Sequence, residues 1–76
     1  MNQIATHQFT IKANDKLGSL ERILRVVRHR GAHIQQMQMQ SIDNHLFILN
    51  LTLTTERTLS SLQSQIGKLE DVIAIE

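Results

Sequence analysis

Two segments of this 76-residue chain alternate apolar and polar residues. The alternation runs through residues 8–13 and, over a longer stretch, through residues 45–54. Because successive side chains of a β-strand point to opposite faces, this period predicts two strands that each bury one face. The apolar positions expected on the buried face are Phe9, Ile11, Ala13, Phe47, Leu49, Leu51 and Leu53.

Two other segments follow the helical period. Between residues 19 and 30, apolar residues recur at the i, i+3, i+4, i+7 spacing, which predicts an amphipathic helix that ends at Gly31. A second helix is expected to begin after a cap at Thr54 or Thr55, with Glu56 in its first turn. The apolar stripes are Leu20, Ile23, Leu24 and Val27 in the first helix and Leu59, Leu62, Ile66 and Leu69 in the second.

Two further strands complete the predicted fold. Residues 33–42 are expected to form a strand with a bulge near Gln35 and Gln36, because Ile34 is out of step with the apolar positions that follow it. Residues 71–76 are expected to form a short last strand. The order strand, helix, strand, strand, helix, strand predicts an α+β ferredoxin-like sandwich, a four-stranded antiparallel sheet with two helices on one face. We expect a single domain over residues 1–76.

The composition argues against several classes of protein. Eight Lys and Arg residues oppose seven Asp and Glu residues, and the formal net charge is +1, whereas a dedicated nucleic-acid binder usually has a strongly basic surface. No apolar run reaches the roughly 20 residues that cross a membrane, and residues 1–12 lack the apolar core of a signal peptide. The absence of cysteine fits a reducing compartment. We therefore expect a cytoplasmic protein without a nucleic-acid or membrane partner.

No group of residues has the spacing of a catalytic or metal site. The four histidines lie on different predicted elements, and Gly31 interrupts the helix between His29 and His33, the two that are four residues apart. The serines lack a nearby base, and the carboxylates are scattered over loops and helix ends. We expect this chain to contain no catalytic residues, no metal and no cofactor.

Basic residues gather on the first predicted helix, at Arg22, Arg25, Arg28, His29 and Arg30. One interpretation is a docking surface for a partner, with Arg22, Arg25 and Arg28 as the candidate contacts. The other is the solvated side of an amphipathic helix, whose last turn favours cations because of the helix dipole. The sequence leaves both interpretations open.

Residues 15–20 connect the first strand to the start of the first helix. Backbone N–H groups at a helix N-terminus lack partners within the helix and carry partial positive charge, so this loop could hold a small carboxylate. Gly18 either lets a ligand approach the backbone or merely shapes the turn, and the residues alone favour neither. Ser19 or Asp15 is the expected cap of the helix.

Two runs of residues resemble the ACT-domain family. Residues 18–23 read Gly-Ser-Leu-Glu-Arg-Ile and residues 30–34 read Arg-Gly-Ala-His-Ile, which is similar to the family pattern G-x-L-x-R-[IV], a helix, then R-G-x-[NH]-[IV]. Within that family, the helix segment 20–31 resembles the small subunits of acetolactate synthase isozyme II. Residues 68–72, Lys-Leu-Glu-Asp-Val, also resemble a segment near the end of such subunits.

The resemblance implies a regulatory role. Such small subunits bind and activate a catalytic large subunit, which uses thiamine diphosphate, magnesium and FAD in the synthesis of branched-chain amino acids. In many isozymes they carry inhibition by valine or another branched-chain amino acid. ACT domains usually form dimers through the second strand, and the effector lies between the first loop of one chain and the second strand of its neighbour. A free-standing amino-acid sensor that acts on another protein is the alternative.

By position, the resemblance assigns the effector site to Asp15, Leu17, Gly18, Ser19, Leu20, His33 and Ile34. The chain departs from the family pattern at three of these positions. Valine-sensitive members usually have asparagine where Asp15 and His33 stand, and Leu17 replaces the usual proline. A carboxylate at position 15 repels the carboxylate of an amino acid but attracts its ammonium group.

Overall fold

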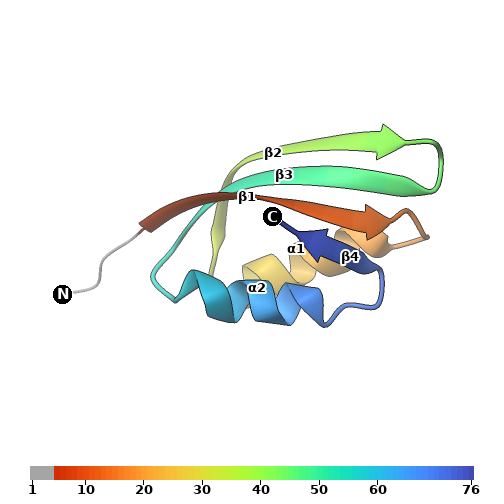
Figure 1. Cartoon of the computed structure of the whole chain (residues 1–76). Helices are drawn as coiled ribbons and strands as arrows, with labels where there is room; N and C mark the ends of the chain where they lie inside the picture. Colours follow the sequence, from red (N-terminus) through yellow and green to blue (C-terminus); the bar gives the residue numbers. More distant parts are fainter. Residues whose placement is uncertain (1–4) are drawn as a thin grey trace.

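The computed structural model describes residues 5–76 and has the predicted order of elements. The sheet order is β2-β3-β1-β4, with antiparallel neighbours, and both helices cover one face (Figure 1). The predicted ferredoxin-like α+β sandwich is therefore confirmed. The elements are β1 (Ala5–Asn14), α1 (Ser19–His29), β2 (His33–Ile42), β3 (Leu46–Thr55), α2 (Leu59–Gly67) and β4 (Val72–Ile75).

The two central strands supply most of the core. Phe9 of β1 lies opposite Leu51 of β3, and Ile11 lies opposite Leu49. Because directly opposed residues of an antiparallel sheet share a face, these side chains all point toward the helices. The predicted buried face is confirmed. The buried apolar residues are Phe9, Ile11, Ala13, Ile23, Val27, Ala32, Phe47, Leu49, Leu51, Leu53, Leu62 and Ile66.

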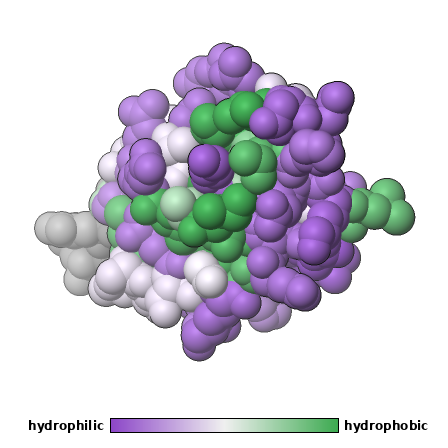
Figure 2. Space-filling model, turned by 45° about the vertical axis from the view of Figure 1, so that its right-hand side comes forward, coloured by the Kyte–Doolittle hydropathy of each residue, from purple (hydrophilic) through white to green (hydrophobic). Residues whose placement is uncertain are grey.

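Strand β2 is an edge strand, and its pairing with β3 shifts register between Ile34 and Gln36. The predicted bulge is confirmed. Met37 and Met39 lie opposite core residues of β3, yet both are nearly half exposed. Apolar surface also gathers within a polar surround on the face shown in Figure 2. Exposed apolar side chains beside an unpaired strand edge are typical of interaction surfaces.

The predicted start of the second helix is wrong. Thr54 and Thr55 belong to β3, where they pair with the first residues of β1, so their backbone is extended. The Thr55 hydroxyl accepts a hydrogen bond from the backbone N–H of Arg57 and forms a local turn. Helix α2 begins four residues after Thr55, behind Thr58, and Glu56 lies outside its first turn.

Helix α2 also ends earlier than its apolar stripe suggested. Its last residue is Gly67, and Leu69 follows in a turn, although Leu69 still packs against the core. The next strand, β4, is two residues shorter than predicted, because Asp71 and Glu76 fall outside it. The connection between α2 and β4, residues 68–71, lies beside the end of β1, because the backbone N–H of Asn14 donates to the carbonyl oxygen of Asp71.

Candidate functional site

The first loop, residues 15–18, is held in place by its neighbours at both sides. The backbone N–H of Asn14 donates to the carbonyl oxygen of Asp71 at 2.8 Å, which ties the loop to the α2–β4 connection. The backbone N–H of Asp15 donates to the carbonyl oxygen of His45 at 2.8 Å, which ties it to the β2–β3 turn. The loop thus lies at the end of the sheet where β2 finishes (Figure 1).

Gly18 has a conformational role in this loop. Its φ of +81° lies in the left-handed region that side chains rarely adopt. It precedes α1 directly, and its carbonyl oxygen accepts the backbone N–H of Arg22 at 3.0 Å. The neighbouring Leu17 is 99% exposed at the tip of the loop. Gly18 therefore directs the chain into the helix, and Leu17 presents an apolar side chain to solvent.

Ser19 stabilises the loop rather than the helix. Its hydroxyl accepts the backbone N–H of Lys16 at 2.9 Å, and its own N–H donates to the carbonyl oxygen of Lys16 at 3.0 Å. Among the described residues, no side chain caps α1, so the predicted cap by Ser19 or Asp15 is wrong. The physical reason is that Gly18, which has no side chain, occupies the N-cap position, while the Ser19 hydroxyl accepts the N–H of Lys16.

An ion pair joins α1 to the α2–β4 connection. The Arg22 guanidinium donates a hydrogen bond to the carboxylate of Asp71, a residue only 5% exposed. This hydrogen bond lowers the pKa of Asp71, and a hydrogen bond with Ser19 and the charges of Arg22 and Lys16 act in the same direction against the effect of burial. Arg22 also lies across Gly18, because a Cβ built there would meet Nη1 of Arg22 at 2.9 Å.

We expect this ion pair to make the stability of the domain depend on pH in acid. The pKa of Asp71 is lower in the folded chain than its unfolded value of about 3.8. The contribution of the ion pair to the free energy of unfolding is therefore complete above pH 3.8 and is lost as the pH falls through the lowered pKa. Urea unfolding between pH 2 and pH 7 should show this loss in the native chain. Asp71→Asn and Arg22→Gln should both give a shallower pH dependence, by up to about one proton. Equal slopes in all three chains would show that the pair contributes nothing.

The predicted effector residues fall into two groups at opposite ends of the sheet. Residues 15–20 lie near the end of β1, whereas His33 lies opposite Thr54, whose other neighbour is Thr6 near the start of β1. Strand β2 has ten residues, so the groups are roughly 30 Å apart. One chain therefore does not bring all of these residues together.

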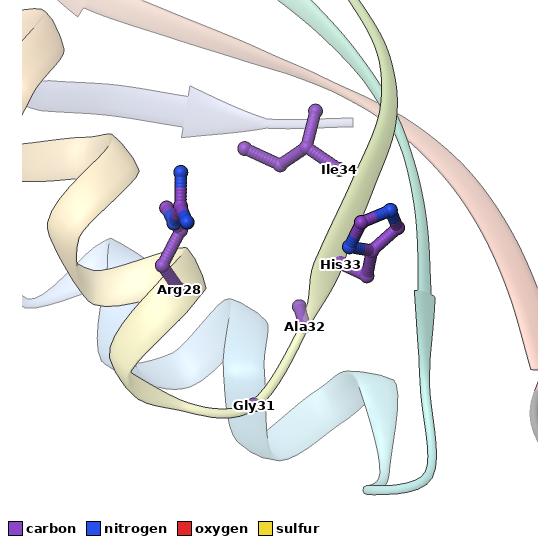
Figure 3. A pocket seen from close by; sticks show the side chains of 5 residues that line it. All are labelled: Arg28, Gly31, Ala32, His33 and Ile34. Atoms are coloured by element: carbon purple, nitrogen blue, oxygen red, sulfur yellow. The ribbon is translucent and has the colours of Figure 1, made fainter.

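The second group, His33 and Ile34, lies at a hollow between the end of α1 and the start of β2. This hollow has a volume of about 290 Å³ and is lined by Arg28, Gly31, Ala32, His33 and Ile34. Arg28 and Ile34 face the opening, while the His33 ring lies on the other side of the strand (Figure 3). The two predicted effector residues of β2 thus point in different directions.

The three arginines predicted to contact a partner do not share one face. Arg22 is paired with Asp71. Arg25 lines a groove between α1 and α2, and Arg28 lines the hollow beside β2. The basic cluster read from the sequence is therefore divided among three different places on α1.

Comparison with known proteins decides the family. The model of the ACT-domain family matches residues 15–75. The isozyme 2 small subunit of acetolactate synthase from Escherichia coli K12 is 42% identical over 67 residues, which cover 87% of this chain and 77% of that protein. The protein of that name from Shigella flexneri gives the same values. The chain belongs to the ACT-domain family. Within it, the chain groups with the acetolactate synthase small subunits.

Solved structures show the same ACT fold. The ACT domain of a GTP pyrophosphokinase from Chlorobium tepidum aligns with a TM-score of 0.84 at 22% identity, over 97% of each chain. A homoserine dehydrogenase from Thiobacillus denitrificans aligns with a TM-score of 0.73 at 19% identity, over 99% of this chain and 17% of its own length. At these identities the likeness concerns the fold alone.

The structure of this ACT domain adds Asp71 to the residues that shape the first loop. Two features of the sequence could have pointed to Asp71. One is the arginine of the G-x-L-x-R pattern, Arg22, and the other is the resemblance of residues 68–72 to the family. Within residues 5–76, no three His, Asp or Glu side chains gather as a metal site would require. No helix of that part of the chain is long and apolar enough to cross a membrane.

Proposed function

We propose that this ACT domain is the regulatory and activating small subunit of an acetolactate synthase in the synthesis of isoleucine, valine and leucine. The observation that carries the proposal is the 42% identity to an acetolactate synthase small subunit over 77% of that protein. In this proposal the chain acts in the cytoplasm and has no catalytic role. The thiamine diphosphate, magnesium and FAD belong to the catalytic large subunit that it binds.

The proposed subunit forms a homodimer through β2. Two features support this pairing: β2 is an edge strand, and its exposed side chains are mostly uncharged. Antiparallel pairing about a twofold axis places the start of one β2 beside the end of the other. His33 of one chain then approaches the β2–β3 turn of its neighbour, which is hydrogen-bonded to Asp15. The two separated groups of effector residues meet across such an interface.

A branched-chain amino acid is the proposed effector at this interface. Within residues 5–76, no side chain caps the N-terminus of α1, and the Ser19 N–H donates to the Lys16 carbonyl oxygen. The next backbone N–H groups, those of Leu20 and Glu21, are the proposed partners of the effector carboxylate near Gly18. The carboxylate of Asp15 offers a partner for the ammonium group. Ile34 and Leu20 are half-buried apolar residues that suit an aliphatic side chain. Leu17, at the exposed tip of the loop, completes the apolar side of the proposed site.

Acetolactate formation by the catalytic subunit of the same organism tests the proposal. We expect the rate to rise several-fold when this chain is added, because activation is the function proposed for it. A series of valine concentrations should then lower the stimulated rate but leave the catalytic subunit alone unaffected. Asp15→Asn is a useful comparison, since it removes the charge that faces the effector while preserving the size of the side chain.

Two results would contradict the proposal. If the chain neither raises the rate nor co-purifies with the catalytic subunit, it is not its small subunit. Specific binding of an amino acid to the isolated chain would then favour a free-standing sensor that acts on another protein. If the rate rises and valine, leucine and isoleucine have no effect at any concentration, the activating role stands and the effector site does not.

A further inference from the structure

A groove lies between the two helices, where the second half of α1 meets α2. It has a volume of about 270 Å³ and is lined by Arg25, Val26, His29, Arg30 and Gln65. Its wall from α1 is basic, and its wall from α2 is the neutral amide of Gln65. Val26 is half buried and packs against the core, so it gives the groove an apolar floor.

The arginines of this groove, Arg25 and Arg30, have no carboxylate partner among the described residues. Within residues 5–76, the ion pair of α1 is formed by Arg22, and no carboxylate lies within 4.0 Å of the Arg25, His29 or Arg30 side-chain nitrogens. The helix dipole accounts for cations in the last turn, but Arg25 lies in the middle of α1. Two arginines without carboxylate partners in residues 5–76, beside an apolar floor, are therefore more than a solvated helix end.

We propose that this groove is the docking site for an acidic segment of the catalytic subunit. The carboxylates of the segment would pair with the groove cations, and one apolar side chain would rest on Val26 between the two helices. This inference rests on the proposed function and names the surface through which the chain would bind the catalytic subunit. The groove lies on the helical layer, whereas the proposed dimer edge and effector loop belong to the sheet and its end, so both can be occupied together.

The chemistry of the groove favours an acidic protein segment over a nucleic acid. Stacking platforms for bases need exposed aromatic side chains. The chain has two Phe and no Tyr or Trp, and both Phe9 and Phe47 are buried in the core. The formal net charge of +1 also provides little long-range attraction for a polyanion.

Charge substitutions on the two walls of the groove test the proposal in the full chain. We expect Arg25→Glu to weaken binding to the purified catalytic subunit about tenfold and to flatten its salt dependence. Gln65→Glu, on the opposite wall, should weaken binding about threefold or more for the same reason. Ser64→Glu is the matched control, because it adds the same charge to an exposed position of α2 outside the groove and should leave the affinity unchanged. Thermal unfolding of each variant verifies that it is folded.

A second probe does not depend on the catalytic subunit. A synthetic peptide of glutamates around a central leucine, titrated into the isotope-labelled chain, should shift the amide signals of Val26 and Gln65. Peptides with lysine in place of glutamate, or alanine in place of leucine, should bind at least about threefold more weakly. Comparable binding by the lysine or alanine peptide would overturn the proposal.

The two experiments separate the groove from the proposed function. If the native chain binds the catalytic subunit and Arg25→Glu and Gln65→Glu bind equally well, the groove is not the docking site although the function stands. Equal weakening by Ser64→Glu leads to the same conclusion. If the native chain does not bind the catalytic subunit but the acidic peptide occupies the groove, the function fails and the groove remains a site for an acidic segment.

Discussion

Leu51→Ala should lower the free energy of unfolding of the isolated chain by about 2–5 kcal/mol at 25 °C, a large share of its total stability. Leu51 is fully buried at the centre of the sheet, between Phe9 on β1 and Met37 on β2. Replacing a buried leucine by alanine costs about 2–5 kcal/mol, through lost burial and the cavity that remains. A chain of this length has a total stability of roughly 4–11 kcal/mol. Urea unfolding followed by circular dichroism measures the loss directly.

Leu17→Ala is the matched control for that substitution. Leu17 is 99% exposed, so the same chemical change should alter the stability by less than about 0.5 kcal/mol. Because a partner that binds only the folded chain stabilises it by mass action, excess catalytic subunit should raise the stability of Leu51→Ala if the proposed complex forms. A stability loss below about 1 kcal/mol for Leu51→Ala would contradict the packing described for the core.

Strands β1 and β3 could be predicted from the alternation of apolar and polar residues, because each of them buries only one face. In β1 and β3, each apolar residue predicted to face the core does so, since a strand that packs helices on one face needs that alternation. The bulge in β2 was predictable for the same reason, as Ile34 can reach the core only if one residue is skipped before Gln36.

The boundary between β3 and α2 could not be predicted from local propensity. Thr54 and Thr55 are good helix caps, but they are also good strand residues. Pairing with the first residues of β1 decides the matter, because the extended β1 offers backbone partners up to Thr55. That partner lies about fifty residues earlier in the sequence, so the choice depends on tertiary structure.

The site was predicted in part for a similar reason. Gly18 was identified because it stands in the polar loop directly before the helical period begins, and its positive φ agrees with a role in that turn. Arg22 was taken only for a partner contact, because its counterion Asp71 lies 49 residues away. His33 and Ile34 stay distant from the loop within one chain, so that half of the proposed site depends on a second copy.

Gly18→Ala should destabilise the domain and loosen the first loop at the same time. An L side chain at φ +81° costs about 1–2 kcal/mol. The added Cβ would lie 2.9 Å from Nη1 of Arg22, so the end of this flexible side chain has to shift, and we expect its hydrogen bond to Asp71 to weaken. Urea unfolding at pH 7 should therefore show a loss of at least about 1 kcal/mol, and amide exchange should be faster at Lys16, whose N–H bonds to Ser19 in the native loop.

The pH dependence distinguishes the two causes of that loss. Backbone strain is the same at every pH, whereas the Arg22–Asp71 contribution disappears from the native chain in acid. The difference between the native chain and Gly18→Ala should thus shrink as the pH falls below 3.8. Gly67→Ala is the control of opposite sign, because a Cβ there meets only Cδ1 of Ile75 at 3.9 Å and alanine favours helix by about 0.5–1 kcal/mol. A constant difference across pH would show that Gly18 sets the backbone of the loop without holding Arg22 against Asp71.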